Sequence, residues 1–584
     1  MSNHSGRRAL LVYPRFARNN LLNYENMTRF YPGKRAVMPP LGLITFAPLL
    51  IERGWEVRLV DENVAELDPE ELHWPDAVFF SGMHPQRRRL NRILEEANAL
   101  GKVTVVGGPS ANICPEYYPG ADAVHQGEIG DATELMLDWL DELVPERGAV
   151  RKPEEQRIFK TVEKTPLDEQ PMPAIGLVRP NRYIIMPIQF SVGCPYTCEF
   201  CDIPVIYGRI ARLKSPERVL AELSAIYDAG FVGTILFVDD NLIANRKAFR
   251  KLLPALVDWQ KERRYPYPLT GEATINIARD EEILKQMHDA RFTHLFLGVE
   301  TPDPETLAHI SKKQNLQDPI VQSIRIIEDH GIEVILGIIF GFDSDTPETG
   351  RKMTAFLKEA NAPLIYFNML AALPKTPLWE RLEREGRLLS QDDGDARSSE
   401  SLLSCLSTNV KYRLDNELVR RMLLDTVREI YSAPEVYRRM LWNAEHVYGK
   451  QIQGVPPTRT KEQVRFVLAF TAGTLANVMV GLGVRAPERR EYWKFLAALV
   501  RLRAQGKIAS VLEVLLRVTP NAHHLITWAR TLLEDHERGL RSPVVEPEPR
   551  PVAKARPRIV VEGGGRATPT GLVPLRARAS AAAG

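Results

Sequence analysis

The sequence predicts an α/β protein with an N-terminal doubly wound (Rossmann-like) domain, a partial (βα)₆ barrel and a C-terminal helical domain. Three observations lead to this prediction. Short apolar strands alternate with helical segments from residue 9 to about 140, and a second alternation begins at Ile184. From about residue 400, apolar residues recur with a spacing near 3.6, which is typical of helices. At 584 residues the chain is also too long for one ordinary core.

We place the domain boundaries where this pattern changes. The Rossmann-like domain takes residues 1–145, a connector rich in Pro, Glu and Lys takes 146–183, the barrel takes 184–399, and the helical domain takes 400–540. Pro, Arg, Ala and Gly dominate residues 541–584 with little periodicity, so we expect a disordered tail.

The first domain is expected to be a parallel sheet, because its strands alternate with helices. We expect strands at 9–14, 55–63, 76–83, 103–108 and 123–126. Ligands of such sheets bind beyond the carboxyl ends of the strands, where glycine lets the backbone approach a ligand closely. A dinucleotide is one candidate ligand, but the first strand–helix turn lacks the GxGxxG pattern.

The second alternation predicts six parallel strands of a partial barrel. The expected strands are 183–193, 233–241, 269–276, 294–301, 333–342 and 363–370. In barrels of this kind the active site lies at the carboxyl edge of the strands.

The overall composition indicates a soluble globular protein, with 44% hydrophobic residues, 26% charged residues and a net charge of +2. This balance gives no argument for a nucleic-acid partner. The apolar run near the N-terminus is too short for an export signal, so we expect a reducing cytoplasmic location, where clustered cysteines indicate metal binding.

One uncharged segment, Phe466–Val484, nearly reaches the length of a membrane span. Its three glycines, two threonines and one asparagine favour a buried helix or helix pair. Membrane or lipid contact is the alternative, so the protein could associate peripherally with the inner face of the membrane.

Three of the five cysteines fall within "GCPYTCEFCDIPVIYGR", residues 193–209. A structural zinc site needs a fourth ligand, but Cys114 and Cys405 are distant in sequence. Four thiolates are the usual ligands of a [4Fe–4S] cluster. Three thiolates would leave one iron open to a small molecule that carries an amine and a carboxylate.

The spacing of Cys194, Cys198 and Cys201 after the first barrel strand, with Phe200 before the last cysteine, resembles the signature of the radical S-adenosylmethionine (SAM) enzymes. The resemblance implies that these cysteines are the catalytic, cluster-binding residues. It also implies S-adenosyl-L-methionine as a cofactor and a one-electron reductant such as a flavodoxin or ferredoxin. In that family the cleaved cofactor abstracts hydrogen from an unactivated C–H bond, while the protein positions the reactants.

The same resemblance implies cofactor contacts at later strand ends. They are Phe200, Asp239 in "FVDDN", Glu272 in "TGEATIN", Glu300 in "LGVET", and Gly337 and Gly341 in "GIIFGFDSDT". A single carboxylate at a strand end can also be a solvated loop charge. The recurrence of acids at successive strand ends favours a ligand role.

The N-terminal domain resembles the cobalamin-binding domain found upstream of one class of radical SAM enzymes. This resemblance implies cobalamin contacts at Pro40, Gly42, Gly82, His84, Gly107, Gly108, Gly127 and Glu128. The chain departs from the DxHxxG pattern, because "SGMHPQ" does not match it. For His84 we therefore favour a packing role over proximity to the corrin.

The phrases "CEFCDI", "FVDDNLIANRKA" and "GEATINIARD" resemble the branch of the family that contains the hopanoid C-2 methylases. This implies a cobalamin-dependent methyltransferase that acts on an unactivated carbon of a hopanoid-like lipid or another small molecule. One alternative is a non-methylating cyclase or oxidase of the anaerobic tetrapyrrole type. A second is a non-catalytic iron–sulfur or cobalamin sensor.

Overall fold

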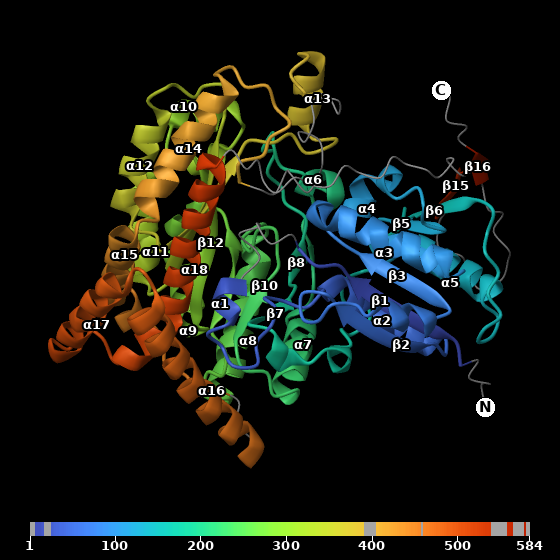
Figure 1. Ribbon diagram of the computed structural model, residues 1–584, viewed down its shortest axis with the longest axis horizontal. Helices are drawn as coiled ribbons and strands as arrows, with labels where there is room; N and C mark the ends of the chain where they lie inside the picture. Colours follow the sequence, from blue (N-terminus) through green and yellow to red (C-terminus); the bar gives the residue numbers. More distant parts are fainter. Residues whose placement is uncertain are drawn as a thin grey trace. The chain divides into compact units, whose positions relative to one another are not determined.

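The computed structural model describes residues 6–16, 25–389, 405–456, 460–538, 558–563 and 577–579. The chain forms two compact units (Figure 1). The first contains residues 1–17, 39–179 and 545–584, and the second contains residues 18–38 and 180–544.

The first unit is built on an eight-stranded sheet with the order β16-β15-β6-β5-β4-β3-β1-β2. The strands are β1 (Arg8–Tyr13), β2 (Glu56–Asp61), β3 (Ala77–Ser81), β4 (Val103–Gly107), β5 (Ala123–Gln126), β6 (Gln156–Lys160), β15 (Arg558–Glu562) and β16 (Ala577–Ala579). All neighbours pair in parallel except β15 with β16. The strand order reverses between β1 and β3, and such a switch point is where doubly wound sheets bind ligands.

Helices cover both faces of this sheet, as predicted. Helices α2 (Leu41–Glu52) and α5 (Asp131–Leu143) contribute Leu43 and Met136 to one core. Helices α3 (Arg87–Ala99) and α4 (Pro109–Ile113) contribute Leu90 and Ala111 to the other. Burying each large aliphatic side chain stabilises the unit by about 1.5–3 kcal/mol.

Three predicted boundaries of the first domain are corrected by the structure. The connector 146–183 contains β6, which pairs with β5 and extends the sheet. Residues 18–38 belong to the second unit, where Lys34 donates to the carbonyls of Tyr183 and Val232, both at 2.6 Å. In the expected disordered tail, β15 pairs with β6 and buries Val561; most other residues of that tail lie outside the described residues.

The second unit contains the six-stranded parallel barrel sheet that the sequence predicts, in the order β14-β13-β12-β11-β10-β7. The strands are β7 (Ile185–Ile188), β10 (Thr234–Phe237), β11 (Leu269–Ala273), β12 (Phe292–Glu300), β13 (Glu333–Phe340) and β14 (Leu364–Met369). Their carboxyl ends lie at one edge because all pairs are parallel.

Helices follow the barrel strands in the order expected of (βα) units. They are α7 (Pro216–Asp228), α8 (Arg246–Glu262), α9 (Glu281–Asp289), α10 (Pro304–His309), α11 (Ile320–Asp329), α12 (Thr349–Ala360) and α13 (Pro377–Arg384). The predicted helical part contains α14 (Asn416–Ile430), α15 (Ala433–His446), α16 (Lys461–Val480), α17 (Arg489–Ala504) and α18 (Val511–Glu537). A further short helix, α1 (Glu25–Thr28), contacts α18.

The uncharged segment Phe466–Val484 forms most of α16 and the π-helical turn that follows, Gly481–Arg485. The expectation of a buried helix is wrong, because only Thr474 and Val478 of α16 are buried. By length and composition, Lys461–Arg485 is one helix that could cross a membrane. Figure 1 shows α16 extending outward from the other C-terminal helices.

Candidate active site at the carboxyl edge of the barrel

The three clustered cysteines lie in one loop that two short strands close. Strand β8 (Ser191–Val192) precedes the loop and pairs antiparallel with β9 (Arg212–Leu213), which follows it. Gly193 has φ +98°, and a Cβ there would lie 3.0 Å from the Gly208 carbonyl, so this entry to the loop requires glycine. The Cys194 amide donates to the same carbonyl at 3.3 Å.

Two aspartates after β10 fix the backbone of this loop. The Asp239 carboxylate accepts hydrogen bonds from the amides of Phe190, at 3.0 Å, and Ser191. Asp240 accepts from the Gly193 amide at 2.8 Å. Burial raises the pKa of Asp239 to about 7, although its hydrogen bonds with the loop oppose the shift. Both Asp239 oxygens therefore bind the loop itself.

The cysteine thiols lie close enough to influence one another electrostatically. Burial raises the pKa of Cys194 and of Cys201, and the neighbouring Cys198 raises both further. Gln314 donates to the Cys198 sulfur at 3.6 Å. This donor set suits a cluster that takes one thiolate per iron.

Within the described part of the chain, no three His, Cys, Asp or Glu side chains are placed to hold a single metal ion. A zinc ion needs its ligands within about 2.0–2.3 Å of one point. The three clustered cysteines are therefore not placed to bind one zinc ion together.

Glu300 lies at the end of β12, where the pairing with β13 shifts register between Gly298 and Glu300. Its φ of +65° is unusual for a residue with a side chain. The buried carboxylate forms an ion pair with buried Lys312. Lys312 Nζ also lies 5.6 Å from the Phe200 ring centre, which brings a cation next to the cysteine loop.

Glu272, at the end of β11, has no described cationic partner. Its side chain is exposed to solvent. Desolvation by the surrounding protein nevertheless raises its pKa to about 7, and the charges of Asp240, Asp239 and Glu300 add to this effect. Four acids from three neighbouring strands thus meet at this edge, and Glu272 is placed to accept a positively charged or hydrogen-bond-donating group.

The two glycines predicted on β13 lie where a side chain would not fit. A Cβ on Gly337 would lie 2.8 Å from the Phe296 ring. Gly341 has φ +106°, and a Cβ there would lie 2.6 Å from the ring of Tyr412. Asp345 accepts from the Gly341 amide at 2.7 Å, so the turn after β13 has a fixed conformation.

The cysteine loop is braced from outside by an ion-pair network. Arg381 on α13 pairs with Glu199, which lies between Cys198 and Cys201, and with Asp343 at 2.8 Å. Arg387 also pairs with Asp343. Burial works to raise the pKa of Asp343, but hydrogen bonds from Arg387 and Arg381 outweigh it and lower this pKa to about 2.

In the first unit, Gly82 and His84 follow β3 at the switch point of the sheet. His84 Nδ1 lies 2.9 Å from Ser110 Oγ, and its ring packs edge-on against Tyr117. Burial, together with the charge of Arg87, lowers the pKa of His84 to about 4. The ring is therefore neutral at pH 7.

The other residues predicted at the carboxyl edge of the first sheet are either packed against neighbouring side chains or located at the start of α2. Gly108 (φ +89°) and Gly127 (φ +120°) pack against Ser81 and Thr161 so closely that a Cβ would overlap these side chains. Gly107 packs against His125, and Glu128 pairs with Lys164 at 2.8 Å. Pro40 is the N-cap of α2, and a Cβ on Gly42 in its first turn would meet nothing within 4 Å. Gly42 therefore borders open space that a ligand can fill.

Comparisons with known proteins match three successive segments of the chain to known families. Residues 35–137 match the B12 binding domain, residues 188–357 the Radical SAM superfamily, and residues 376–538 a domain of unknown function, DUF4070. The hopanoid C-2 methylase of Rhodopseudomonas palustris is 39% identical over 92% of this chain and 96% of its own length.

The chain belongs to the hopanoid C-2 methylase family of cobalamin-binding radical SAM enzymes. An uncharacterized methyltransferase of Synechocystis is 37% identical over 85% of this chain and 88% of its own length. The protein is therefore a cobalamin-dependent radical SAM methyltransferase. Its cofactors are a [4Fe–4S] cluster, S-adenosylmethionine and cobalamin.

Two solved structures share the fold at low identity. The cobalamin-dependent radical enzyme OxsB, with aqua-cobalamin and S-adenosylmethionine bound, aligns with a TM-score of 0.56 at 16% identity over 92% of this chain and 82% of its own. The methyltransferase TsrM from Kitasatospora setae, with cobalamin and a [4Fe–4S] cluster bound, aligns with a TM-score of 0.52 at 16% identity. The alignment covers 86% of this chain and 100% of the TsrM chain.

The sequence did not predict several residues of the candidate site in this methyltransferase. Lys312, Gln314, Arg381 and Tyr412 reach the site from segments that carry no recognisable motif. The acids and glycines at the strand ends were found because their positions follow directly from the strand pattern. The others depend on tertiary contacts alone.

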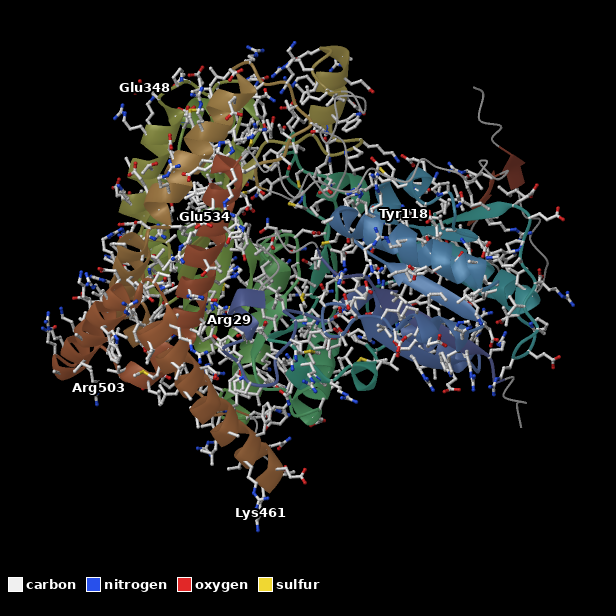
Figure 2. The ribbon with its side chains drawn as sticks, viewed as in Figure 1. Arg29, Tyr118, Glu348, Lys461, Arg503 and Glu534 are labelled. Carbon is white, nitrogen blue, oxygen red and sulfur yellow. The ribbon has the colours of Figure 1, made fainter. Side chains whose placement is uncertain are left out.

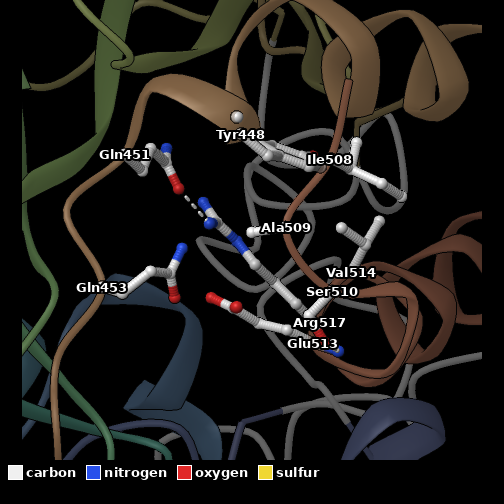
Figure 3. Close-up of a pocket in the computed structure, with 10 residues that line it drawn as sticks. Tyr448, Gln451, Gln453, Ile508, Ala509, Ser510, Glu513, Val514 and Arg517 are labelled. Atoms are coloured by element: carbon white, nitrogen blue, oxygen red, sulfur yellow. Dashed lines mark hydrogen bonds between the residues drawn. The ribbon is translucent and has the colours of Figure 1, made fainter. Parts of the chain in front are cut away.

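A pocket of this methyltransferase lies among residues of its C-terminal helical part (Figure 3). Tyr448, Gln451 and Arg517 line it, and Arg517 donates to His294 near the start of β12. Gln451 donates to the Thr293 and Gly331 carbonyls, so these side chains attach the C-terminal helices to the base of the barrel. The pocket is remote from the cysteine loop along the strands.

Proposed function

We propose that this protein transfers a methyl group to a ring carbon of a hopanoid lipid, with C-2 as the first position to test. The observation that carries the proposal is the similarity to the hopanoid C-2 methylase, which extends over 539 residues. The match therefore includes most of the chain outside the two cofactor domains. Relatives with other activities share less: the anaerobic magnesium-protoporphyrin IX monomethyl ester cyclase of Rubrivivax gelatinosus is 23% identical over 59% of this chain.

In the proposed site, Cys194, Cys198 and Cys201 would hold the cluster, which would supply the electron for cleavage of S-adenosylmethionine bound beside it. Phe200, Glu272, Glu300, Gly337 and Gly341 surround that cofactor. The bound cofactors together supply an electron, a hydrogen-abstracting radical and a methyl group. The chain's own residues orient these groups and exclude water.

We assign Asp239 a positioning role in place of cofactor contact. Both of its oxygens accept hydrogen bonds from the loop that leads to Cys194. Lys312 is proposed to offset negative charge near the cluster, because Glu300, Cys198 and Cys201 all favour its charged form. Glu272 is proposed to face the positively charged part of S-adenosylmethionine.

In the first unit we propose that cobalamin lies over the carboxyl edge near Gly42, Gly82 and His84. Gly107, Gly108, Gly127 and Glu128 shape the loops of that edge, and Pro40 starts the helix that carries Gly42. His84 is proposed to pack against Ser110 and Tyr117 and is not assigned as a cobalt ligand. A flavodoxin or ferredoxin in the cytoplasm is the proposed electron donor.

The decisive experiment is anaerobic turnover with the reconstituted protein, a hopanoid, and S-adenosylmethionine labelled with ¹³C in its methyl group. We expect the label in the hopanoid at C-2, together with 5′-deoxyadenosine, and no label with Cys198→Ala. Labelled methyl groups at another hopanoid carbon would show that the enzyme methylates that carbon instead of C-2. Formation of 5′-deoxyadenosine with an oxidised or cyclised product that lacks the label would favour the non-methylating alternative.

A further inference from the structure

The outer side of α16 is an exposed apolar surface that the methyltransferase reaction does not explain. The exposed fractions of Val464, Leu468 and Val480 are 43%, 65% and 45%, and that of Val484 in the following turn is 65%. Only 22% of the most apolar 18-residue window is buried. An exposed helix face normally carries charged residues, so an apolar face of this kind marks a surface that another body covers.

The opposite side of α16 is docked on its own unit, which fixes the direction of the exposed surface. The ring of Phe470 stacks on Tyr31 with centroids 5.8 Å apart. Gly473 lies against Pro32, where a Cβ would come within 2.6 Å of the proline ring. Asn477 donates to the Phe30 carbonyl at 3.2 Å. Because protein covers this side, lipid cannot surround the helix as it surrounds a membrane-spanning helix.

Basic residues lie at both ends of the apolar surface. Lys461 and Arg465 are exposed in the first turns of α16, and Lys461 marks its outer end in Figure 2. Arg485, Arg489 and Arg490 are exposed after its last turn. Residues 461–490 contain only two acids, Glu462 and Glu488; Glu488 is buried and bound to His523 and Arg530. Each of these cations would be attracted to an anionic membrane surface.

A tryptophan stands beside the end of the apolar surface. Trp493 on α17 is 44% exposed, and its indole N–H donates to the Gly483 carbonyl at 3.0 Å. Its ring is thereby held next to the turn that carries Val484. Tryptophan is enriched at membrane–water interfaces, where an apolar ring and a polar N–H both find partners.

We propose that α16 and Trp493 form a monotopic membrane-docking surface that inserts its apolar side into an anionic lipid surface. A helix of 20 residues is about 30 Å long, with charges only near its ends, and can lie in the plane of the interface. We assign this surface the role of giving access to a lipid substrate, and that role rests on the proposed function. Membrane binding itself does not depend on the proposed function.

The test is co-sedimentation of the reconstituted full-length protein with vesicles of phosphatidylcholine, with and without phosphatidylglycerol. We expect binding to the anionic vesicles that weakens as salt concentration rises. The double variant Leu468→Gln/Val484→Gln should bind at least about ten-fold more weakly, because two apolar side chains no longer leave water. Arg485→Gln/Arg489→Gln should weaken binding to anionic vesicles and flatten its salt dependence.

The matched control is Ile51→Gln, which replaces a 47% exposed isoleucine on α2 of the other unit and should bind as the wild type does. Circular dichroism and cluster absorbance check that each variant is folded. Absence of vesicle binding by the folded wild type overturns the proposal. So does self-association in analytical ultracentrifugation that Leu468→Gln/Val484→Gln abolishes without changing vesicle binding.

Turnover separates this proposal from the proposed function. If both hold, the double variant should methylate hopanoid in detergent micelles at the wild-type rate and hopanoid in anionic vesicles several-fold more slowly. Vesicle binding without methylation of hopanoid in either form would overturn the substrate assignment and leave the docking surface supported.

Discussion

Glu272 is the acid at the barrel edge whose charge the described part of the chain leaves least compensated. Asp239 and Asp240 accept hydrogen bonds from the cysteine loop, and Glu300 pairs with Lys312. Desolvation by the surrounding protein, then the charges of these acids, raises the pKa of the exposed Glu272 side chain to about 7. A cationic ligand would favour the ionised form and lower this pKa. Binding of S-adenosylmethionine should therefore release a proton from Glu272 near neutral pH.

This predicts that the affinity for S-adenosylmethionine rises as pH increases from 6 to 8 (about one unit on each side of that pKa), because more of the unliganded protein then carries an ionised Glu272. Glu272→Gln should bind about ten-fold more weakly at the upper pH and lose most of the slope, since a charge-assisted hydrogen bond contributes about 1.5–3 kcal/mol. Anaerobic calorimetry measures both effects. Glu282→Gln on α9 is the control, because its carboxylate is exposed. If the pH dependence of the affinity persisted unchanged in Glu272→Gln, the proton released on binding would come from another group.

For individual residues, the local sequence predicted the cluster ligands but not the side chains that hold the site in position. Cys194, Cys198 and Cys201 were predictable because ligands of one cluster share one short loop. Lys312 was not, because its importance arises from the register shift at Glu300 that brings the two side chains together. Asp239 was correctly placed at a strand end. Its two hydrogen bonds to the loop could be known only from the folded backbone.

Helix α13 illustrates how one element holds another in the second unit. Thr376 caps its first turn by accepting from the Trp379 amide at 3.2 Å. The helix presents Arg381 to Glu199 in the cysteine loop, and the Leu378 amide donates to the Glu199 carbonyl at 3.0 Å. Both side chains are mostly buried, so this pair is screened less by water than a surface pair.

Arg381→Gln is therefore predicted to loosen the cysteine loop without unfolding the barrel. We expect iron release to a chelator about ten-fold faster than in the wild type, which corresponds to the loss of one charge-assisted contact. Arg381→Lys should restore only part of the retention, because lysine lacks the two-pronged geometry. Arg384→Gln is the control on the same helix; among the described residues, Arg384 donates to the Glu380 carbonyl alone, at 3.3 Å. Equal iron release in Arg381→Gln and Arg384→Gln would show that the pair does not brace the loop.

Strands that alternate regularly with helices could be predicted from the sequence. The pairing of an isolated strand and the solvent exposure of a helix could not. The six barrel strands recur in a regular alternation with helices, and all were found. β6 is no shorter than several of them, but it was missed because "QRIFK" lies within a segment rich in Pro, Glu and Lys. The segment Phe466–Val484 was expected to be buried because it holds glycines, threonines and an asparagine, but burial depends on which partner covers the helix.

The whole molecule combines two compact units that carry different cofactor domains. The B12 binding match, residues 35–137, falls mainly in the first unit, and the Radical SAM match, residues 188–357, falls entirely in the second. A ligand stabilises the unit that binds it by an amount set by its concentration relative to its dissociation constant. The two cofactors should therefore act on different unfolding transitions.

Anaerobic scanning calorimetry of the reconstituted protein is predicted to show two transitions. At one hundred times its dissociation constant, cobalamin should add about 2.7 kcal/mol to the stability of the first unit. This corresponds to a rise of roughly 5–10 °C in the midpoint of a unit of this size. S-adenosylmethionine should raise only the other transition. If cobalamin raised both midpoints equally, the two units would unfold as one cooperative body, and the cofactors would stabilise the enzyme jointly.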